Sequence, residues 1–261
     1  MSATVEVHNM TRKYGTFTAV DHISFEIMEG EVFGFLGANG AGKTTSIRML
    51  TGLLEPTAGE AQVAGCDVRT EPDRVKQRIG YMSQKFALYD DLTVKENIRL
   101  YGGIYGLLAN EIRQRRDRLL QRLGFEHAAD ERVGSIPLGW KQKLAFSVAL
   151  LHEPGVVFLD EPTSGVDPVT RRQFWEMIYE AASGGTTVLV TTHYMDEAEY
   201  CDRVSIMVEG TIDALGTPTA LKSNYDAETM DDVFVRVAEG GDSIRRRQSL
   251  SRRAPRFPVC V

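Results

Sequence analysis

A segment near position 40 has the residue types and spacing that bind phosphate. Gly37-Ala38-Asn39-Gly40-Ala41-Gly42-Lys43-Thr44 matches G-x-x-x-x-G-K-S/T at each fixed position, and helix-forming residues follow from Thr45 to Leu50. Glycines let the backbone curl so that successive N–H groups point into one concavity, where phosphate oxygens bind. Lys43 adds a charge for the β and γ phosphates, and Thr44 offers a hydroxyl to Mg²⁺. The segment therefore predicts a site for a nucleoside triphosphate with Mg²⁺.

Two carboxylates follow an apolar run farther along the chain. Val156-Val157-Phe158-Leu159 has the character of a buried strand, and Asp160-Glu161 comes directly after it. In open α/β sheets, ligands bind outside the carboxyl ends of the strands. We expect Asp160 to hold Mg²⁺, directly or through water, and Glu161 to polarise the attacking water as general base. An acidic pair after a strand can also be an ordinary turn, but beside the phosphate loop it indicates a P-loop NTPase.

Alternating strands and helices must position these residues. Three short segments indicate buried strands, at 31–36, 156–159 and 186–191, and helical segments alternate with strands through most of the chain. Residues 1–30 and 60–82 instead alternate apolar and polar positions, which predicts a half-exposed antiparallel sheet. The predicted fold is α/β: a P-loop NTPase with a mainly parallel core sheet, an antiparallel β subdomain and an inserted α-helical subdomain.

The helical insert is expected at about residues 86–151. Ile112, Leu119, Leu120 and Leu123 share one face of a helix there. The opposite face carries five arginines: Arg113, Arg115, Arg116, Arg118 and Arg122. We interpret them as a solvated helix face and not as a binding patch.

Charge divides the chain into a folded part, residues 1–240, and a basic tail, residues 241–261. The tail holds six arginines against one aspartate, a net charge of +5, which leaves −11 for the rest of a chain whose total is −6. An acidic body is a poor general binder of nucleic acid, because that affinity depends on neutralising phosphates. We expect the tail to be a disordered, solvated terminus, and no specific nucleic acid as a partner.

The apolar pattern and the cysteines indicate the cellular compartment. No apolar run approaches the roughly 18 to 20 residues that cross a bilayer, and the N-terminus has no secretory pattern. Cys66, Cys201 and Cys260 are scattered and odd in number, which argues against a disulfide framework or a zinc site. A reducing cytosol is the expected compartment.

The residues after the acidic pair resemble one family of P-loop proteins. The segment from Asp160 to Pro168 is similar to the joined Walker B motif and D-loop of ATP-binding cassette (ABC) proteins, and the resemblance covers about residues 4–237. It implies that Tyr14 stacks on adenine, an interaction worth about 1 to 3 kcal/mol. It also implies that Gln84 reaches Mg²⁺ and the attacking water, and that His193 contacts the γ-phosphate.

The same resemblance implies partners. Members of the family dimerise around ATP and drive transmembrane permease subunits, so we expect a second nucleotide-binding domain and a separate permease, with this chain on the cytoplasmic face of the membrane. Residues 86–89, after Gln84, would line the groove that contacts the permease. The segments 192–199 and 229–234 are similar to those of the exporter branch, so the expected function is ATP hydrolysis coupled to export.

One motif departs from the family pattern. Where the family has its signature motif, L-S-G-G-Q, this chain has Ile136-Pro137-Leu138-Gly139-Trp140. In the family this segment caps the γ-phosphate bound by the opposite subunit, using a serine hydroxyl, glycine N–H groups and a helix N-terminus. Pro137 supplies neither hydroxyl nor N–H, although proline is tolerated at the first position of a helix. Gly139 remains as the expected ligand, and the dimer is either a homodimer or a heterodimer whose partner has an intact signature.

Two other classes of protein share some of these motifs. The alternative within the family is a non-transport ABC ATPase that acts on nucleic acid or ribosomes, but those proteins carry two cassettes or a long coiled-coil insert, which this sequence lacks. The alternative outside the family is a GTPase or kinase. No N-K-x-D sequence for reading guanine is present, and Tyr14 favours adenine without excluding guanine.

Overall fold

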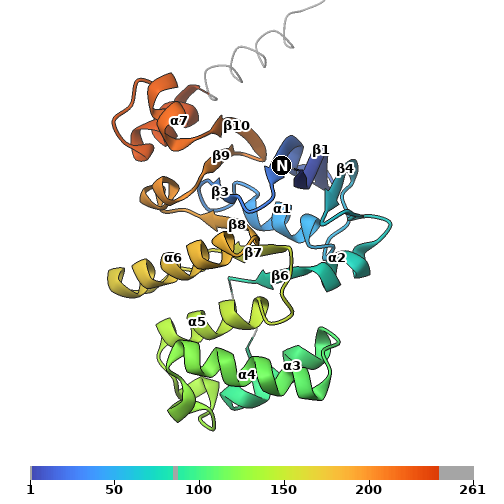
Figure 1. The fold of residues 1–261 in the computed structure, drawn as a ribbon. Helices are drawn as coiled ribbons and strands as arrows, with labels where there is room; N and C mark the ends of the chain where they lie inside the picture. The colour runs from blue at the N-terminus through green and yellow to red at the C-terminus, as the bar shows by residue number, and fades with distance from the viewer. Residues whose placement is uncertain (1, 85–87, 241–261) are drawn as a thin grey trace, which may run out of the picture.

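The computed structural model describes residues 2–84 and 88–240 (Figure 1). Its strands are β1 (Ala3–Tyr14), β2 (Phe17–Met28), β3 (Val32–Leu36), β4 (Ala58–Val63), β5 (Cys66–Asp67), β6 (Ile79–Met82), β7 (Val156–Asp160), β8 (Thr187–Thr192), β9 (Arg203–Val208) and β10 (Thr211–Gly216). Its α-helices are α1 (Lys43–Leu50), α2 (Pro72–Arg78), α3 (Val94–Ile104), α4 (Ala109–Leu123), α5 (Leu138–Ala149), α6 (Pro168–Ser183) and α7 (Pro218–Asn224). Short 3₁₀ helices are η1 (Glu126–Ala128), η2 (Val133–Ser135) and η3 (Met195–Tyr200).

A six-stranded sheet forms the centre of the molecule, in the order β10-β9-β3-β8-β7-β6. All neighbouring pairs are parallel except β9 with β10. Every residue of β3, β7 and β8 is buried, because apolar layers cover both faces of these strands. Successive residues of β7 point to opposite faces of the sheet. Phe158 packs with α1 and the second sheet, whereas Val157 and Leu159 pack with α5 and α6. The three predicted buried strands are confirmed.

The second sheet is antiparallel and has the order β2-β1-β4-β5. In β2 the buried residues Ile23, Phe25 and Ile27 alternate with exposed ones, as period-two patterning requires of a half-covered sheet. Phe25 stacks on Phe33 of the central sheet with ring centroids 5.5 Å apart. These contacts confirm the predicted antiparallel subdomain and join it to the core.

One part of that prediction is wrong. The alternation over residues 60–82 predicts part of the antiparallel sheet, but Pro72–Arg78 forms α2 and Ile79–Met82 forms β6, which pairs in parallel with β7 at the edge of the central sheet. The strand packs closely at Gly80, where an added Cβ would lie 2.3 Å from the carbonyl oxygen of Ala149. Because α5 approaches the strand this closely, β6 has both faces covered and cannot belong to an open sheet.

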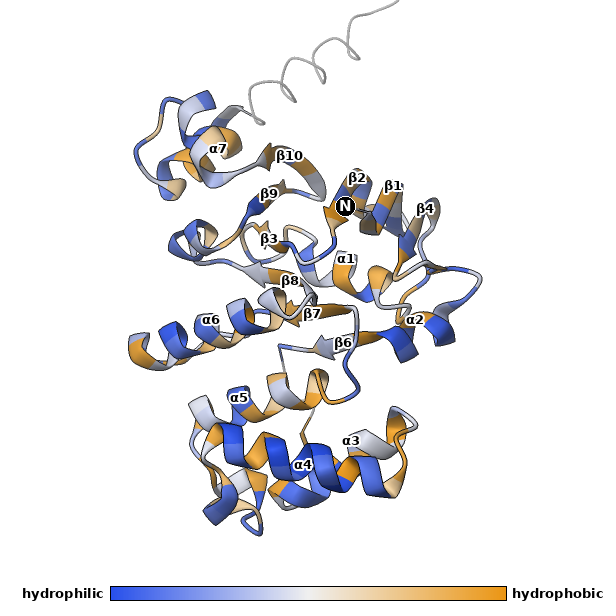
Figure 2. Ribbon diagram, viewed as in Figure 1, coloured by the Kyte–Doolittle hydropathy of each residue, from blue (hydrophilic) through white to orange (hydrophobic). Residues whose placement is uncertain are grey.

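Helices α3, α4 and α5 lie together at one end of the molecule, within the interval predicted as a helical insert (Figure 1). Ile112, Leu119 and Leu120 of α4 are buried, as predicted. The opposite face of α4 is strongly hydrophilic (Figure 2). It is not only solvated, however: the Arg115 guanidinium donates to the Leu151 carbonyl oxygen at 2.6 Å. The arginine face therefore also fastens α4 to the residues that follow α5.

Among the described residues, no helix combines the length and the apolar character needed to cross a bilayer. The basic tail, residues 241–261, and the expected groove residues Phe86 and Ala87 lie outside the described part of the chain. Of the other two expected groove residues, Leu88 is buried and Tyr89 is exposed.

A half-buried histidine connects the helical region to the central sheet. The ring of His152 stacks on Tyr105 with centroids 3.7 Å apart, and its Nε2 lies 3.1 Å from the carbonyl oxygen of Ile79. Burial lowers the pKa of His152 to about 4. The imidazole is therefore neutral in the folded protein at pH values where a free histidine is protonated.

We expect the free energy of unfolding to decrease as the pH falls from about 6.5 to 4. In that window the unfolded chain binds a proton at His152 and the folded chain does not, so acid favours unfolding by up to about 3 kcal/mol. His152→Phe retains a stacking ring and should remove this part of the pH dependence. His127→Phe, at an exposed ring, is the control. Urea unfolding at pH 4.5 and 7 measures the difference, and an unchanged pH slope in His152→Phe would contradict the assignment.

Candidate active site

The predicted site residues meet at the carboxyl edge of the central sheet. Leu36, the last residue of β3, pairs with Thr192 in the β3–β8 ladder, and Asp160 pairs with Thr191 in the β7–β8 ladder. Because these strands are parallel and in register, the loops that follow them emerge side by side. The loops carry the phosphate-binding segment after β3, Glu161 after β7 and His193 after β8.

The phosphate-binding segment forms the turn between β3 and α1. Gly40 and Gly42 have φ values of 84° and 110°, which side-chain-bearing residues rarely adopt. At Gly42 an added Cβ would also lie 2.7 Å from the Ala19 carbonyl oxygen. Gly42 is the N-cap of α1, where no side chain caps the helix and no acidic residue stands in the first turn. The positive end of α1 is thus available to an external anion.

The remaining predicted members of this segment surround the turn. Asn39 is exposed, Ala41 is buried, and Thr45 lies partly exposed in the first turn of α1. At Gly37 a Cβ would lie 2.5 Å from the Met207 carbonyl oxygen, so the loop has to pass close to β9. The segment from Gly37 to Thr45 therefore forms the turn after β3 and the first turn of α1.

Lys43 links this loop to the acidic pair. Its ammonium donates to the carbonyl oxygens of Gly37 at 2.6 Å and Ala38 at 3.1 Å, and lies 3.7 Å from Glu161 Oε1. Burial lowers the pKa of Lys43, and the negative charges of Glu161 and Asp160 partly offset that effect. The arrangement presents a desolvated positive charge inside the loop, where its attraction for phosphate is less screened than in water.

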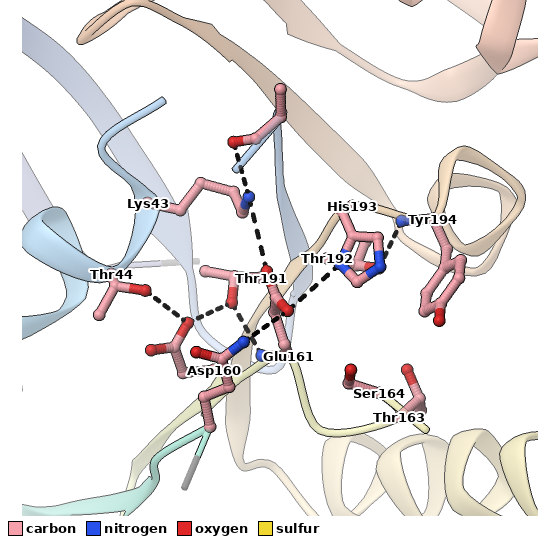
Figure 3. Close-up of polar contacts among 12 residues, drawn as sticks. Lys43, Thr44, Asp160, Glu161, Thr163, Ser164, Thr191, Thr192, His193 and Tyr194 are labelled. Carbon is pink, nitrogen blue, oxygen red and sulfur yellow. Dashed lines mark hydrogen bonds and ion pairs between the residues drawn. The ribbon is translucent and has the colours of Figure 1, made fainter. Parts of the chain in front are cut away.

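Glu161 is the centre of the polar contacts at this edge (Figure 3). Its Oε2 accepts a hydrogen bond from Gln84 Nε2 at 2.9 Å and lies 3.2 Å from His193 Nδ1. Its side chain is 9% exposed. With φ of 50°, Glu161 adopts a left-handed conformation that costs a non-glycine residue about 1 to 3 kcal/mol. Such a carboxylate, held among a cation, an amide and an imidazole, is suited to orienting and deprotonating a water molecule.

Asp160 lies beside Glu161 and faces α1. Its Oδ1 accepts hydrogen bonds from Thr191 Oγ1 at 2.7 Å and Thr44 Oγ1 at 3.2 Å. Burial raises the pKa of Asp160, and the two hydroxyl donors act in the opposite direction. A carboxylate so nearly excluded from solvent, at 1% exposure, is stabilised by a cation.

The donor set fits Mg²⁺. Thr44, Asp160 and Gln84 offer hydroxyl, carboxylate and amide oxygens, the hard ligands that Mg²⁺ prefers. In the described ranges 2–84 and 88–240, no three His, Cys, Asp or Glu side chains form a metal-binding group. Mg²⁺ is usually held by one or two carboxylates together with substrate phosphates and water.

Tyr14 ends β1 and is exposed over 47% of its surface. The Arg12 guanidinium lies 4.7 Å from the centroid of the Tyr14 ring, and Arg12 also donates to the Glu55 carbonyl oxygen at 2.7 Å. One face of the ring is therefore supported by an anchored cation. An exposed, supported aromatic ring can stack on a planar base.

The atypical segment lies at the start of α5. Pro137 is the N-cap residue, one position earlier than the expected first helical position, and no side chain caps the helix. Gly139 faces α6 closely: an added Cβ would lie 2.6 Å from Thr170 Cγ2. Trp140 turns toward the helical region and meets Phe125 edge-on at 4.2 Å. Gly139 therefore has a packing reason to be glycine, besides any contact with a ligand.

The sequence motifs missed a buried polar cluster next to the site. Glu197 is fully buried, and its Oε1 accepts a hydrogen bond from Thr163 Oγ1 at 2.6 Å and lies 3.6 Å from Arg171 Nε. The Arg171 guanidinium covers the ring of Tyr194 at 4.2 Å, immediately after His193. The cluster connects the loops after β7 and β8. A hydrophobic pattern could not reveal it, because Thr163 and Glu197 are polar and lie 34 positions apart in the sequence.

Sequence comparison agrees with this geometry. Residues 20–164 match the family model described as "ABC transporter". The chain is 44% identical over 243 residues to the probable multidrug ABC transporter ATP-binding protein YbhF of Escherichia coli K12, covering 91% of this chain and 42% of YbhF. It is 37% identical over 232 residues to the linearmycin resistance ATP-binding protein LnrL of Bacillus subtilis 168, covering 88% of this chain and 75% of LnrL.

Comparison of structures gives the same grouping. A structure titled as the ATP-binding subunit of an ABC transporter superposes with a TM-score of 0.81 and 28% identity, covering 90% of this chain and 99% of the other. The YbhF proteins of E. coli and Shigella flexneri are much longer than the region they share, because the match spans 42% of their length.

Proposed function

Because the chain belongs to the ABC transporter family of ATP-binding proteins, we propose that it is a Mg²⁺-dependent ATPase that powers export through separate transmembrane permease subunits. The observation that carries the proposal is the meeting of Lys43, Asp160 and Glu161 at one edge of the sheet. These are a phosphate-binding cation, a metal-binding carboxylate and a candidate general base.

The residues of the site divide the proposed reaction among them, and Gln84 takes part in two of its tasks. The loop N–H groups and Lys43 bind the β and γ phosphates of ATP, and Tyr14 stacks on adenine. Glu161 accepts a proton from the attacking water, while Gln84 and His193 orient the Glu161 carboxylate. Thr44, Asp160 and Gln84 would hold Mg²⁺, which would neutralise negative charge on the phosphates.

The relatives support export as the purpose of hydrolysis. YbhF is named for multidrug transport and LnrL for linearmycin resistance, and other relatives are named as Nod factor export ATP-binding proteins. None of these names concerns nucleic acid or ribosomes. We propose that this chain works on the cytoplasmic face of a membrane, docked on a permease and paired with a second nucleotide-binding domain, as a homodimer or a heterodimer.

Nucleotide binding tests the proposal most directly. Lys43→Ala should raise the Kd for ATP at least about 10-fold, because it removes the desolvated charge inside the phosphate loop. Lys222→Ala is the control, since Lys222 pairs with Glu199 on the surface. Competition of ATP and GTP against a fluorescent ATP analogue measures both affinities. Equal binding by the two variants, or stronger binding of GTP than ATP, would refute the assignment.

The partner can be identified separately. Affinity capture of the tagged chain from detergent-solubilised membranes should co-purify a permease with membrane-spanning helices. Recovery of ribosomes or nucleic acid in its place would favour the non-transport alternative.

A further inference from the structure

Thr191 contacts both acidic residues of the site through a single hydroxyl group. Its Oγ1 donates to Asp160 Oδ1 at 2.7 Å and accepts the Glu161 N–H at 2.9 Å (Figure 3). The side chain is fully buried, and Thr191 lies directly opposite Asp160 in the ladder between β7 and β8. The roles described above for the phosphate loop, the acidic pair and His193 do not explain why a hydroxyl group stands at this position.

The first contact fixes the orientation of the Asp160 carboxylate. Within the part of the chain that the structure describes, the side-chain hydroxyls of Thr191 and Thr44 both donate to Oδ1. The other oxygen, Oδ2, takes part in neither of these two hydrogen bonds and is the one through which Asp160 would bind a cation. Partners of this kind keep a metal-binding carboxylate ionised and aimed, and their loss typically lowers metal affinity or activity about 10- to 100-fold.

The second contact supports an unusual backbone conformation. Glu161 has a φ of 50°, and its N–H points between the Oγ1 of Thr191 at 2.9 Å and the carbonyl oxygen of Thr191 at 3.2 Å. A strained residue at a functional site persists only where its surroundings hold it. The hydroxyl therefore helps to keep the Glu161 side chain directed toward Lys43, Gln84 and His193.

A purely structural threonine on the same strand provides a comparison. Thr187, at the other end of β8, is also fully buried, and its Oγ1 accepts the Gly30 N–H at 3.0 Å. That hydroxyl ties a turn to the sheet on the side away from the active-site edge. Thr187 and Thr191 therefore share residue type, strand and burial but differ in what their hydroxyls contact.

We propose that Thr191 is a positioning residue for ATP hydrolysis, whose hydroxyl aims Asp160 at Mg²⁺ and holds the main chain of Glu161. The inference rests on the ATPase function proposed above. Thr191 acts on the metal-binding carboxylate and on the general base, and it has no part in binding adenine or the phosphates.

The test uses Thr191→Val, which keeps the branched shape and removes the hydroxyl. The affinity of the protein–ATP complex for Mn²⁺, measured by electron paramagnetic resonance, should fall about 10- to 100-fold, and kcat should fall by a similar factor. ATP affinity in EDTA should be unchanged, because Lys43 and the loop remain. Thr191→Ser should restore Mn²⁺ affinity and kcat. Thr187→Val should alter none of these measurements, although it removes a buried hydroxyl from the same strand.

Specific results would overturn the inference. Wild-type Mn²⁺ affinity in a folded Thr191→Val protein would refute it. Should that variant fail to fold, Thr191→Ser and Thr191→Ala remain as a pair that differs only by the hydroxyl, and equal Mn²⁺ affinities in the pair would refute it as well. A wild-type protein that binds no ATP would overturn the proposed function together with this inference, whereas ATP binding with unaltered metal affinity in Thr191→Val overturns the inference alone.

Discussion

Replacing Glu161 with glutamine should lower ATP hydrolysis about 10²- to 10⁴-fold while leaving ATP affinity nearly unchanged. The amide cannot accept the proton of the attacking water. The phosphate contacts of Lys43 and the metal contacts of Asp160 do not depend on Glu161 acting as a base. ATP should therefore stay bound and unhydrolysed, which is detected by analysing the nucleotide that remains with the protein after gel filtration.

The control for this prediction is another glutamate with the same unusual backbone. Glu153 has a φ of 58°, compared with 50° for Glu161, and its side chain is largely exposed beside Arg115. Glu153→Gln should hydrolyse ATP at the wild-type rate, which separates the chemistry of the carboxylate from the effect of an amide in a left-handed conformation. Near-normal turnover in Glu161→Gln would show that another group is the general base.

The parts of the site that could be predicted are those whose geometry is local. A glycine-rich turn between a strand and a helix specifies its own phosphate concavity, so the segment from Gly37 to Thr44 was recognisable without tertiary information. Asp160 ends β7, whose other four residues are all apolar, and Glu161 follows it; the apolar run marks the strand as buried and places its carboxyl end at a ligand site. Gln84 and His193 were identified through the family resemblance.

The parts that the sequence did not reveal depend on pairing between distant segments. The Thr191 hydroxyl matters because β8 lies in register with β7, so that it meets a carboxylate from a strand 31 positions earlier in the chain. In sequence, Thr191 is only one more β-branched residue in a strand. Likewise, β6 has only four residues, one of which is a glycine. It is too short to show a periodicity that would assign it to the parallel sheet.

The structure sharpens the question raised by the atypical signature. Leu138 begins α5 and is 41% exposed, while Gln142 Nε2 donates to the Ser164 carbonyl oxygen at 3.1 Å, linking α5 to the loop after β7. The helix N-terminus is therefore firmly placed, but Pro137 brings neither a hydroxyl nor an N–H to it. In a homodimer, both ATP molecules would meet this deficient cap. A heterodimer would give the ATP bound at this chain's phosphate loop a cap from a partner with an intact signature, and we favour that arrangement.

We therefore expect the purified chain alone to be a slow ATPase, and Pro137→Ser with Leu138→Gly to accelerate it. One preorganised donor to developing charge is worth about 2.7 to 4 kcal/mol, so the gain in kcat should be about 10²- to 10³-fold. Pro137→Ala with Leu138→Gly is the matched control, because it differs from the first variant only by the hydroxyl and should gain less. Steady-state ATP hydrolysis at saturating ATP measures all three proteins. A wild-type homodimer that already turns over at an ordinary enzyme rate, and slows when the serine and glycine are introduced, would show that Pro137 and Leu138 form a working cap and that no heterodimer is needed.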